Sequence, residues 1–286
     1  MSAKLAVPNK GRLYEPTINL LRDAGIGVIE RGSRQLFADT NIPDLEVVFV
    51  RTNDIPNMVE SGAADLGITG HDLVLENGCN VEEILDLGFG KARMVAAVHE
   101  KSSIDSVEDL DDDVKVATEF PNVTRDYFDE KGIEIVLTEV SGATEITPFI
   151  GVADVIVDIT STGTTLRTHG LEVIDTLFDT SVRLIANPQS LEDGEGKIED
   201  VRMALESVIK AKPRKLVMLN APEEKISKIK KLMPGMSGPT VSKVEGTDLL
   251  AVQAVVQSEE INEIVNKLKK EGARDILIIP IERVLL

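Results

Sequence analysis

Short aliphatic segments alternate with helix-like segments from the beginning of the chain. Apolar, β-branched strands are expected at Lys4–Val7, Leu45–Val50 (LEVVFV) and Leu66–Thr69. Helices are expected between these strands, at Glu15–Ala24 and from a cap at Asn53 or Asp54 to a stop at Ser61–Gly62. Because strands that alternate with helices pack side by side under helical layers, the pattern predicts an α/β fold with a mostly parallel sheet.

A second α/β block follows the first. Its strands are expected at Met94–Val98, Val114–Thr118, Ile133–Val140 and Val155–Asp158. Arg183–Asn187 is expected to return the chain to the first block, ahead of a long amphipathic helix at Lys197–Lys212. Two lobes joined by crossing segments leave a cleft between them, which is a common place for ligands.

The pattern changes after residue 212. Strands at Lys215–Asn220, Pro239–Val244, Leu249–Gln257 and Asp275–Ile281, with helices at Pro222–Leu232 and 258–271, give the order β-α-β-β-α-β. That order is typical of a ferredoxin-like domain. We therefore expect lobe I at 1–93, completed by 181–212, lobe II at 94–180, and a ferredoxin-like domain at 213–286.

Charge and composition exclude several functions. The formal net charge is −18, from 31 Lys and Arg against 49 Asp and Glu, so nucleic acid is not an expected partner. Any phosphate site must instead be local, made of backbone N–H groups, a few cations or a bound metal ion. The single cysteine, Cys79, cannot form an intramolecular disulfide, and the three histidines lack metal-ligand spacing. No signal peptide or membrane-spanning segment is found, so a cytoplasmic location is expected.

The segment ADVIVDITSTGTTLRTHG (153–170) carries the clearest chemical signal. A strand ends at Asp158 and leads into a hydroxyl-rich turn around Gly163, after which a helix is expected. Orphan N–H groups at a helix start, a glycine that allows close approach and several hydroxyls suit a phosphomonoester. Asp158 could accept hydrogen bonds from ribose hydroxyls or hold a metal-bound water. An ordinary capped helix after a strand accounts for this stretch equally well.

Charged residues also follow other strands. Lys10, Gly11 and Arg12 come after the first strand, and Arg51 comes after LEVVFV. Asp72 and Glu119 follow two further strands. Each of these charges alone is more often a solvated loop charge. Because the carboxyl ends of parallel strands meet at one sheet edge, the residues of the first block are expected to face a shared ligand, and Glu119 is expected to face the same way from the second lobe.

Three motifs occur in a familiar order and spacing: LAVPNKGRL, RTNDIPNMVESGAADLGITGHDL and VIVDITSTGTTLRTHGL. Together they resemble the ATP phosphoribosyltransferases of histidine biosynthesis over essentially the whole chain. The tail, with PGMSGPTVS, resembles the long form, which has a histidine-binding C-terminal domain. The resemblance implies two lobes like those of periplasmic binding proteins, and transfer of phosphoribose from phosphoribosyl pyrophosphate to N1 of ATP. It also implies Mg²⁺, feedback inhibition by histidine, and homo-oligomers, as dimers and hexamers.

The resemblance also implies roles for individual residues. Lys10, Arg51 and Asp158 would be catalytic. Substrates would be bound by Gly11, Asp72, Glu119, Thr160, Ser161, Thr162, Gly163, Thr164 and Thr165. Inhibitory histidine would contact Asn220, Met236, Gly238, Thr240 and Val255, although Gly238 stands where the family pattern has a serine.

Three other functions are compatible with parts of the sequence. A two-lobed chain with ESGAADLGITG also resembles solute-binding proteins and the effector domains of transcription regulators. The missing signal peptide argues against the first, and the absence of an evident helix-turn-helix or basic patch argues against the second. A catalytically idle regulatory relative is the third possibility, against which the intact 158–165 turn argues.

Overall fold

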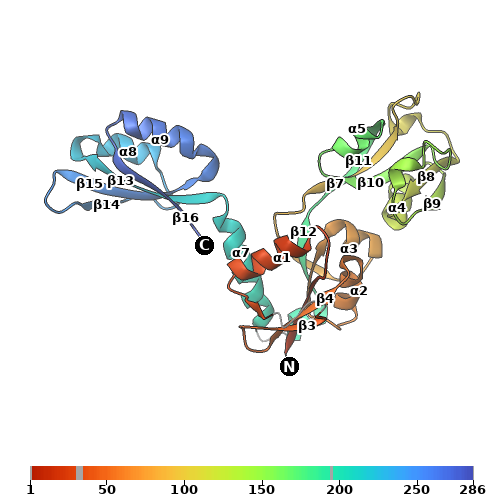
Figure 1. Ribbon diagram of the computed structural model, residues 1–286, viewed down its shortest axis with the longest axis horizontal. Coiled ribbons are helices and arrows are strands. Elements are labelled where there is room, and N and C mark those ends of the chain that lie inside the picture. The colour runs from red at the N-terminus through yellow and green to blue at the C-terminus, as the bar shows by residue number, and fades with distance from the viewer. Residues whose placement is uncertain (1, 30–34, 194–195, 286) are drawn as a thin grey trace. The chain divides into compact units, whose positions relative to one another are not determined.

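The computed structural model describes residues 2–29, 35–193 and 196–285, and it divides into two compact units (Figure 1). The first unit comprises Met1–Arg22 and Ile26–Arg202, and the second comprises Asp23–Gly25 and Met203–Leu286. This division falls inside helix α7 (Lys197–Ala211), ten residues before the boundary expected from the sequence. The domain boundaries given above therefore stay predictions.

Lobe I of the first unit is built on a seven-stranded sheet in the order β2-β3-β4-β1-β5-β12-β6. Its strands are β1 (Ala3–Pro8), β2 (Val28–Ile29), β3 (Phe37–Thr40), β4 (Leu45–Val50), β5 (Leu66–Gly70), β6 (Glu82–Asp86) and β12 (Val182–Ala186). Its helices are α1 (Tyr14–Asp23), α2 (Ile55–Glu60), α3 (His71–Asn77) and α6 (Pro188–Asp193). The return of the chain into this sheet through β12 is confirmed, since β12 pairs with β5 and β6.

Lobe II is built on a five-stranded sheet in the order β11-β7-β10-β8-β9. Its strands are β7 (Ala92–His99), β8 (Val114–Thr118), β9 (Ile135–Glu139), β10 (Val155–Thr160) and β11 (Leu171–Thr180). Helices α4 (Pro121–Lys131) and α5 (Thr164–Thr168) accompany this sheet. Its core is aliphatic, with Phe128 as a fully buried aromatic side chain.

The expectation of mostly parallel sheets is wrong. β1 pairs in parallel with β4 and β5, and β8 pairs in parallel with β9 and β10. The other strand pairs of the two sheets, among them β12 beside β5 and β11 beside β7, are antiparallel. β11 was not expected at all, because its two register shifts break the apolar–polar alternation by which a strand is recognised.

Two chain segments cross between the lobes, and they run beside each other. The Leu87 N–H donates to the Val182 carbonyl at 2.9 Å, and the Val182 N–H donates to the Phe89 carbonyl at 3.0 Å. A side chain at Gly90 would come within 2.7 Å of a Val182 methyl group. The two crossings therefore pack as one ribbon between lobes I and II.

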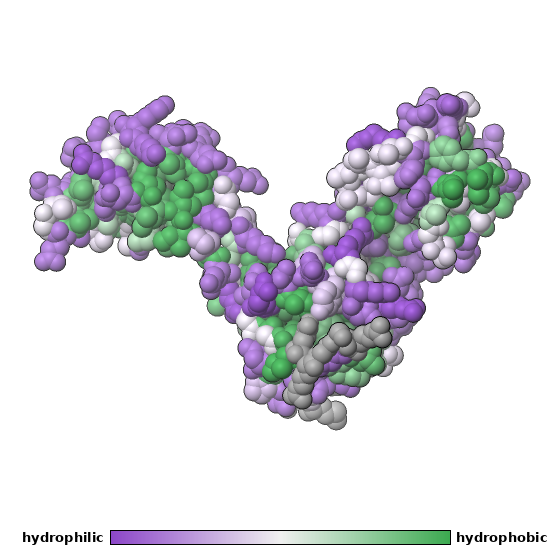
Figure 2. All heavy atoms as spheres, viewed as in Figure 1, coloured by the Kyte–Doolittle hydropathy of each residue, from purple (hydrophilic) through white to green (hydrophobic). Residues whose placement is uncertain are grey.

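The second unit contains a four-stranded antiparallel sheet in the order β14-β15-β13-β16. Its elements are β13 (Arg214–Pro222), α8 (Ile226–Leu232), β14 (Thr240–Lys243), β15 (Leu249–Gln257), α9 (Ile261–Lys270) and β16 (Arg274–Pro280). The β-α-β-β-α-β order is confirmed. Figure 2 shows hydrophobic residues at the surface of this unit, and three consecutive residues of the edge strand β16, Leu277, Ile278 and Ile279, are exposed.

Close packing of α2 on β5 depends on Gly67. A methyl group at this position would come within 2.6 Å of Ile55 Cγ2 and 2.8 Å of Val59 Cγ2. Both of those side chains are fully buried. A side chain at residue 67 can therefore be accommodated only if the helix moves away from the sheet.

We expect Gly67→Ala to destabilise the protein by about 1–3 kcal/mol, the usual range for overpacking a filled core. Denaturant unfolding measures this difference. Val59→Ala removes one of the two clashing methyl groups, so the double variant should lose less stability than the sum of the single losses. Strict additivity of the two losses would contradict the proposed clash.

Candidate active site

A cavity of about 380 Å³ lies between the two lobes. Lobe I contributes residues that follow β1, β4 and β5, the three strands that run parallel to one another. Lobe II contributes residues at the ends of β8 and β10, and the crossings contribute Gly90, Ser181 and Val182. Loops at the carboxyl ends of neighbouring parallel strands thus converge on one hollow, as α/β sheets generally arrange their ligand sites.

Several residues singled out from the sequence line this cavity, namely Lys10, Gly11, Asp72 and Glu119. Arg51 is exposed and does not line it, but the next two residues, Thr52 and Asn53, do. Of the segment 158–165, Ile159 reaches the cavity. The structure therefore brings the lobe I residues together and places the hydroxyl-rich turn beside the cavity.

The loop after β1 is shaped by its glycine. Gly11 has φ of +83°, in the left-handed region, and its carbonyl accepts a hydrogen bond from the Tyr14 N–H where α1 begins. The turn leaves Lys10 and Arg12 exposed, on either side of Gly11 and both lining the cavity. Two cations are thereby presented on one short turn.

Asp72 is held rigidly at the start of α3. It is 7% exposed, its Oδ1 accepts a hydrogen bond from the Thr180 hydroxyl at 2.8 Å, and its N–H donates to the same hydroxyl at 3.1 Å. The carboxylate folds back over Gly70, where a Cβ would lie 2.3 Å from Asp72 Oδ1. Thr180 ends the strand that returns from lobe II, so this carboxylate is tied to the crossing between the lobes.

The turn after β10 folds around its own hydroxyls. The Gly163 N–H donates to the buried Thr160 hydroxyl at 2.9 Å, and Thr162 Oγ1 donates to Thr164 Oγ1 at 2.9 Å. Gly163 has φ of +69° and precedes the short helix α5. The amides in the first turn of a helix have no intrahelical acceptor, and exposed Ser161, Thr164 and Thr165 surround this one with hydroxyls.

Asp158, two residues before the end of the same strand, has a strongly perturbed acidity. Burial is the main cause that raises the pKa of its carboxyl to about 6, and the nearby carboxylates of Glu119 and Glu145 contribute to that rise. The Ile159 N–H, which donates to Asp158 Oδ1 at 2.6 Å, and the positive charge of Arg12 oppose that rise. An acid that is half-charged near pH 6 beside a cleft is typical of a functional site.

Sequence reasoning missed four residues of this region. The sequence places Arg12 on the charged turn beside Lys10 but assigns it no role of its own, and its positive charge opposes the rise in the pKa of Asp158. Glu76 and Ser181 line the cavity, and Glu145 approaches Asp158 from a separate loop. The NKGR turn could have indicated Arg12, but nothing in the local sequence marks the other three, which tertiary contacts alone bring to the cleft.

The residues predicted to bind histidine do not form one hollow in the second unit. Asn220 lines a cavity of about 230 Å³ on the sheet, and its side-chain amide donates to Asp275 Oδ2 at 2.9 Å. Met236 and Val255 line a different cavity of about 450 Å³. Val255 pairs with Leu216, four residues from Asn220 along β13 and thus about 13 Å away. Gly238 is exposed on the segment that leads into β14, and Thr240, the first residue of β14, is also exposed.

Two further properties bear on ligands and location. Among residues 2–29, 35–193 and 196–285, no cluster of three or more His, Cys, Asp or Glu side chains has the geometry to hold a metal ion. Over the same ranges, no helix is both long and apolar enough to cross a membrane.

Comparison with known proteins identifies relatives over the full chain. A family model described as ATP phosphoribosyltransferase matches residues 51–207, and one described as HisG, C-terminal domain, matches 211–283. The ATP phosphoribosyltransferases of Methanosarcina barkeri and Methanopyrus kandleri are each 52% identical to this chain, over 99% and 98% of it and 99% of their own lengths. A solved structure of the ATP phosphoribosyl transferase (HisG:HisZ) complex from Thermotoga maritima superposes with a TM-score of 0.62 at 31% identity. That alignment covers 71% of this chain and 98% of the other.

The raised pKa of Asp158 has a consequence for stability. The folded state retains its proton up to about pH 6, whereas the unfolded chain releases it near the ordinary value of 3.8. Between these values the folded state binds more protons, so this group makes the protein less stable as pH rises from about 4 to 6. We expect Asp158→Asn to increase the free energy of unfolding by about 1–3 kcal/mol at pH 7.

Denaturant unfolding at several pH values measures that gain, which should shrink as pH falls from 6 towards 4. Glu130→Gln, which changes an exposed carboxylate in the same lobe, is the control and should leave stability nearly unchanged. A gain of equal size at pH 4.5 and pH 7 would show that burial of the charge is not its cause.

Proposed function

Because this chain belongs to the ATP phosphoribosyltransferase family, we propose that its interlobe cleft transfers the 5-phosphoribosyl group of phosphoribosyl pyrophosphate to N1 of ATP. The products are phosphoribosyl-ATP and pyrophosphate, and the reaction is the first step of histidine biosynthesis. The observation that carries this proposal is the juxtaposition of two lobe I cations with an acid and a hydroxyl-rich turn from lobe II.

The turn at 160–165 is proposed to hold the 5-phosphate of the sugar. Its first-turn amides, its hydroxyls and the backbone at Gly163 are suited to phosphate oxygens. Asp158 lies at the base of this turn and would accept hydrogen bonds from the ribose hydroxyls, an interaction that favours its charged form. Substrate binding is thus expected to offset part of the destabilisation that burial of this carboxylate causes.

Lobe I is proposed to hold ATP and the pyrophosphate leaving group. Lys10 and Arg51 would neutralise charge on the leaving oxygens, while Gly11, Asp72 and Glu119 would line the nucleotide. The bond between C1 of the ribose and pyrophosphate breaks, with its electron pair leaving on the oxygen, as the adenine N1 lone pair forms the new bond. N1 is already a nucleophile, so positioning and leaving-group stabilisation account for catalysis without a strong base.

Mg²⁺ is proposed to be carried by the pyrophosphate rather than by a protein cage. The described residues form no cluster of three potential metal ligands. The carboxylates of Glu119 and Glu145 nevertheless lie close enough to Asp158 to raise its pKa. Magnesium is commonly held by one or two carboxylates together with substrate phosphates, and Asp158 and Glu119 fit that role. The ion would supply additional positive charge to the leaving group.

A local site also reconciles phosphate binding with the charge of the molecule. The formal net charge of −18 repels polyphosphates at long range. Lys10 and Arg12, on one exposed turn, create a positive region limited to the cleft. The affinity for substrate is therefore expected to depend on these few cations.

The second unit is proposed to bind histidine as a feedback inhibitor and to contribute to homo-oligomers. Asn220, Met236, Gly238, Thr240 and Val255 are the proposed contacts. The separation of Asn220 from Val255 within one chain favours a site completed by a second copy. Exposure of apolar residues on β16 supports association of this unit with another copy. A cytoplasmic location is proposed from the biosynthetic role.

Lys10→Ala should lower kcat/KM by at least about 30-fold, equivalent to about 2 kcal/mol of transition-state stabilisation. Its stability should stay within about 0.5 kcal/mol of the parent, because the side chain is exposed. Pyrophosphate release from ATP, phosphoribosyl pyrophosphate and Mg²⁺ is the assay. Lys115→Ala, which removes an exposed lysine outside the cavity, is the matched control. A Lys10 variant as active as this control would refute the role of Lys10, and an inactive parent protein would refute the proposed function.

Asn220→Ala should raise the histidine concentration needed for half-inhibition by at least about fivefold, because one direct hydrogen bond is worth about 1 kcal/mol. The uninhibited kcat should not change. The same assay, run across a histidine titration, gives both values. Asn262→Ala, an exposed asparagine on α9, serves as the control. Unchanged inhibition in the Asn220 variant would remove this residue from the histidine site.

A further inference from the structure

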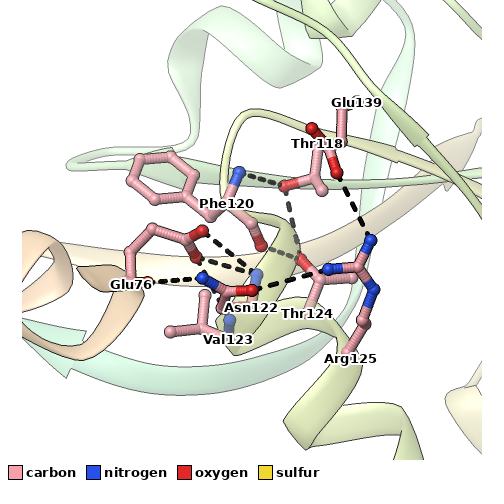
Figure 3. Close-up of polar contacts among 8 residues, drawn as sticks. All are labelled: Glu76, Thr118, Phe120, Asn122, Val123, Thr124, Arg125 and Glu139. Atoms are coloured by element: carbon pink, nitrogen blue, oxygen red, sulfur yellow. Dashed lines mark hydrogen bonds and ion pairs between the residues drawn. The ribbon is translucent and has the colours of Figure 1, made fainter. Parts of the chain in front are cut away.

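Helices α3 of lobe I and α4 of lobe II meet at the wall of the cleft through reciprocal hydrogen bonds (Figure 3). Both carboxylate oxygens of Glu76 accept from the Asn122 N–H at 3.1 Å, and Oε2 also accepts from the Val123 N–H at 3.1 Å. In return, the Asn122 side-chain amide donates to the backbone carbonyl of Glu76 at 2.8 Å. Each lobe thus supplies hydrogen-bond partners to backbone groups of the other lobe.

These contacts supply caps that neither helix has within its own lobe. α4 begins with Pro121, which has no N–H, and Phe120 before it provides no side-chain cap. The next two amides would lack acceptors without the Glu76 carboxylate. The Glu76 carbonyl lies in the last turn of α3, where carbonyls likewise lack intrahelical donors. A negative charge at the N-terminus of α4 is also favoured by the helix dipole.

The start of α4 is fixed firmly to the rest of lobe II. The Thr124 hydroxyl donates to the Phe120 carbonyl at 2.6 Å, and the Phe120 N–H donates to Thr118 Oγ1 at 2.9 Å (Figure 3). Any displacement of the α4 N-terminus therefore also moves Glu119 and Phe120, which line the cavity.

On the other side, α3 carries cleft residues of lobe I. Asp72 precedes Glu76 by four residues, so both lie on the same face of the helix, and both line the cavity. Leu73, from the same helix, packs against the hydrophobic core of lobe II. The contact between α3 and α4 is thus both polar and apolar, and it joins two walls that bear proposed ligand contacts.

We propose that Glu76 is a positioning residue, which caps α4 across the cleft and so fixes the distance between the wall carrying Asp72 and the wall carrying Glu119. This role rests on the proposed function for the identity of the nucleotide. Glu76 acts through α4 rather than on the reacting atoms. Burial raises the pKa of Glu76, and the hydrogen bonds from the Asn122 and Val123 N–H groups oppose that rise.

The consequence for catalysis follows from a population argument. Without the cap, the two walls separate more often, and the fraction of molecules ready to bind ATP falls. The apparent affinity then falls by the same factor, whereas saturating ATP restores the closed arrangement. Loss of the cap should therefore raise KM for ATP and leave kcat nearly unchanged.

The test uses the full-length protein with Glu76→Ala, Glu76→Gln, Asn122→Ala and the Glu76→Ala/Asn122→Ala double variant. We expect Glu76→Ala to raise KM for ATP at least fivefold with kcat within twofold of the parent. Glu76→Gln retains one acceptor oxygen and should recover part of the loss. The double variant should raise KM by less than the product of the two single effects, because both residues act at one junction.

Glu60→Ala is the matched control, because Glu60 accepts a hydrogen bond from the Asn80 N–H at 2.7 Å within lobe I. Hydrogen exchange at residues 120–126 gives a readout that does not depend on turnover. It should accelerate at least tenfold in Glu76→Ala and remain unchanged in Glu60→Ala. Unchanged exchange, or a KM for ATP equal to that of the control, would overturn the positioning role. An inactive parent protein would instead overturn the proposed function, and the exchange measurement would still decide whether Glu76 caps α4.

Discussion

Antiparallel pairing of β12 with β5 is the interaction on which the cleft depends. It brings Thr180 and Ser181, at the end of the second crossing, beside the start of α3. The Ser181 carbonyl accepts a hydrogen bond from the His71 N–H at 3.0 Å, and the Thr180 hydroxyl holds the Asp72 carboxylate. The crossing is thereby bonded directly to the cavity-lining edge of lobe I. A shift of the crossing segment would therefore also move the residues at the start of α3 that line the cleft.

The charge of the Gly11 turn, on the lobe I side of the cleft, is opposite in sign to the net charge of the molecule. An acidic chain presents two cations on the Gly11 turn, while lobe II presents Asp158 in a setting that disfavours its charge. Such a carboxylate lowers the stability of the ligand-free protein, in which it accepts a hydrogen bond from the Ile159 N–H, and under the proposed function it would gain further partners when the sugar binds. This is the usual relation between stability and function at a site that is organised before the substrate binds.

Two contacts hold the lobes around this site in different ways. The paired crossings at Phe89 and Val182 limit the directions in which the lobes can move, since they form one ribbon. The Glu76–Asn122 junction lies at the cavity wall and adds a polar contact between the lobes. Under the proposed positioning role, the ribbon would keep the lobes aligned while the junction separates to admit substrates.

The sequence predicted most elements because local signals determine them. LEVVFV and VKVAT became strands with the expected bounds, and the β-α-β-β-α-β order of the tail was correct. The direction of each strand was harder to predict, because parallel and antiparallel strands have similar amino-acid composition when both faces of the sheet are covered. The bulged strand β11 had no regular period to detect.

By itself, the sequence determined the element order, the chemistry available at each strand end, and the family through three spaced motifs. Only the tertiary structure decided which of those groups meet. Glu76 and Asn122 are 46 residues apart, and Asp72 and Thr180 are 108 apart. Contacts at such separations depend on how strands pair and lobes pack. No local pattern of side chains encodes that outcome, because each partner alone is an ordinary polar residue near the end of a helix or strand.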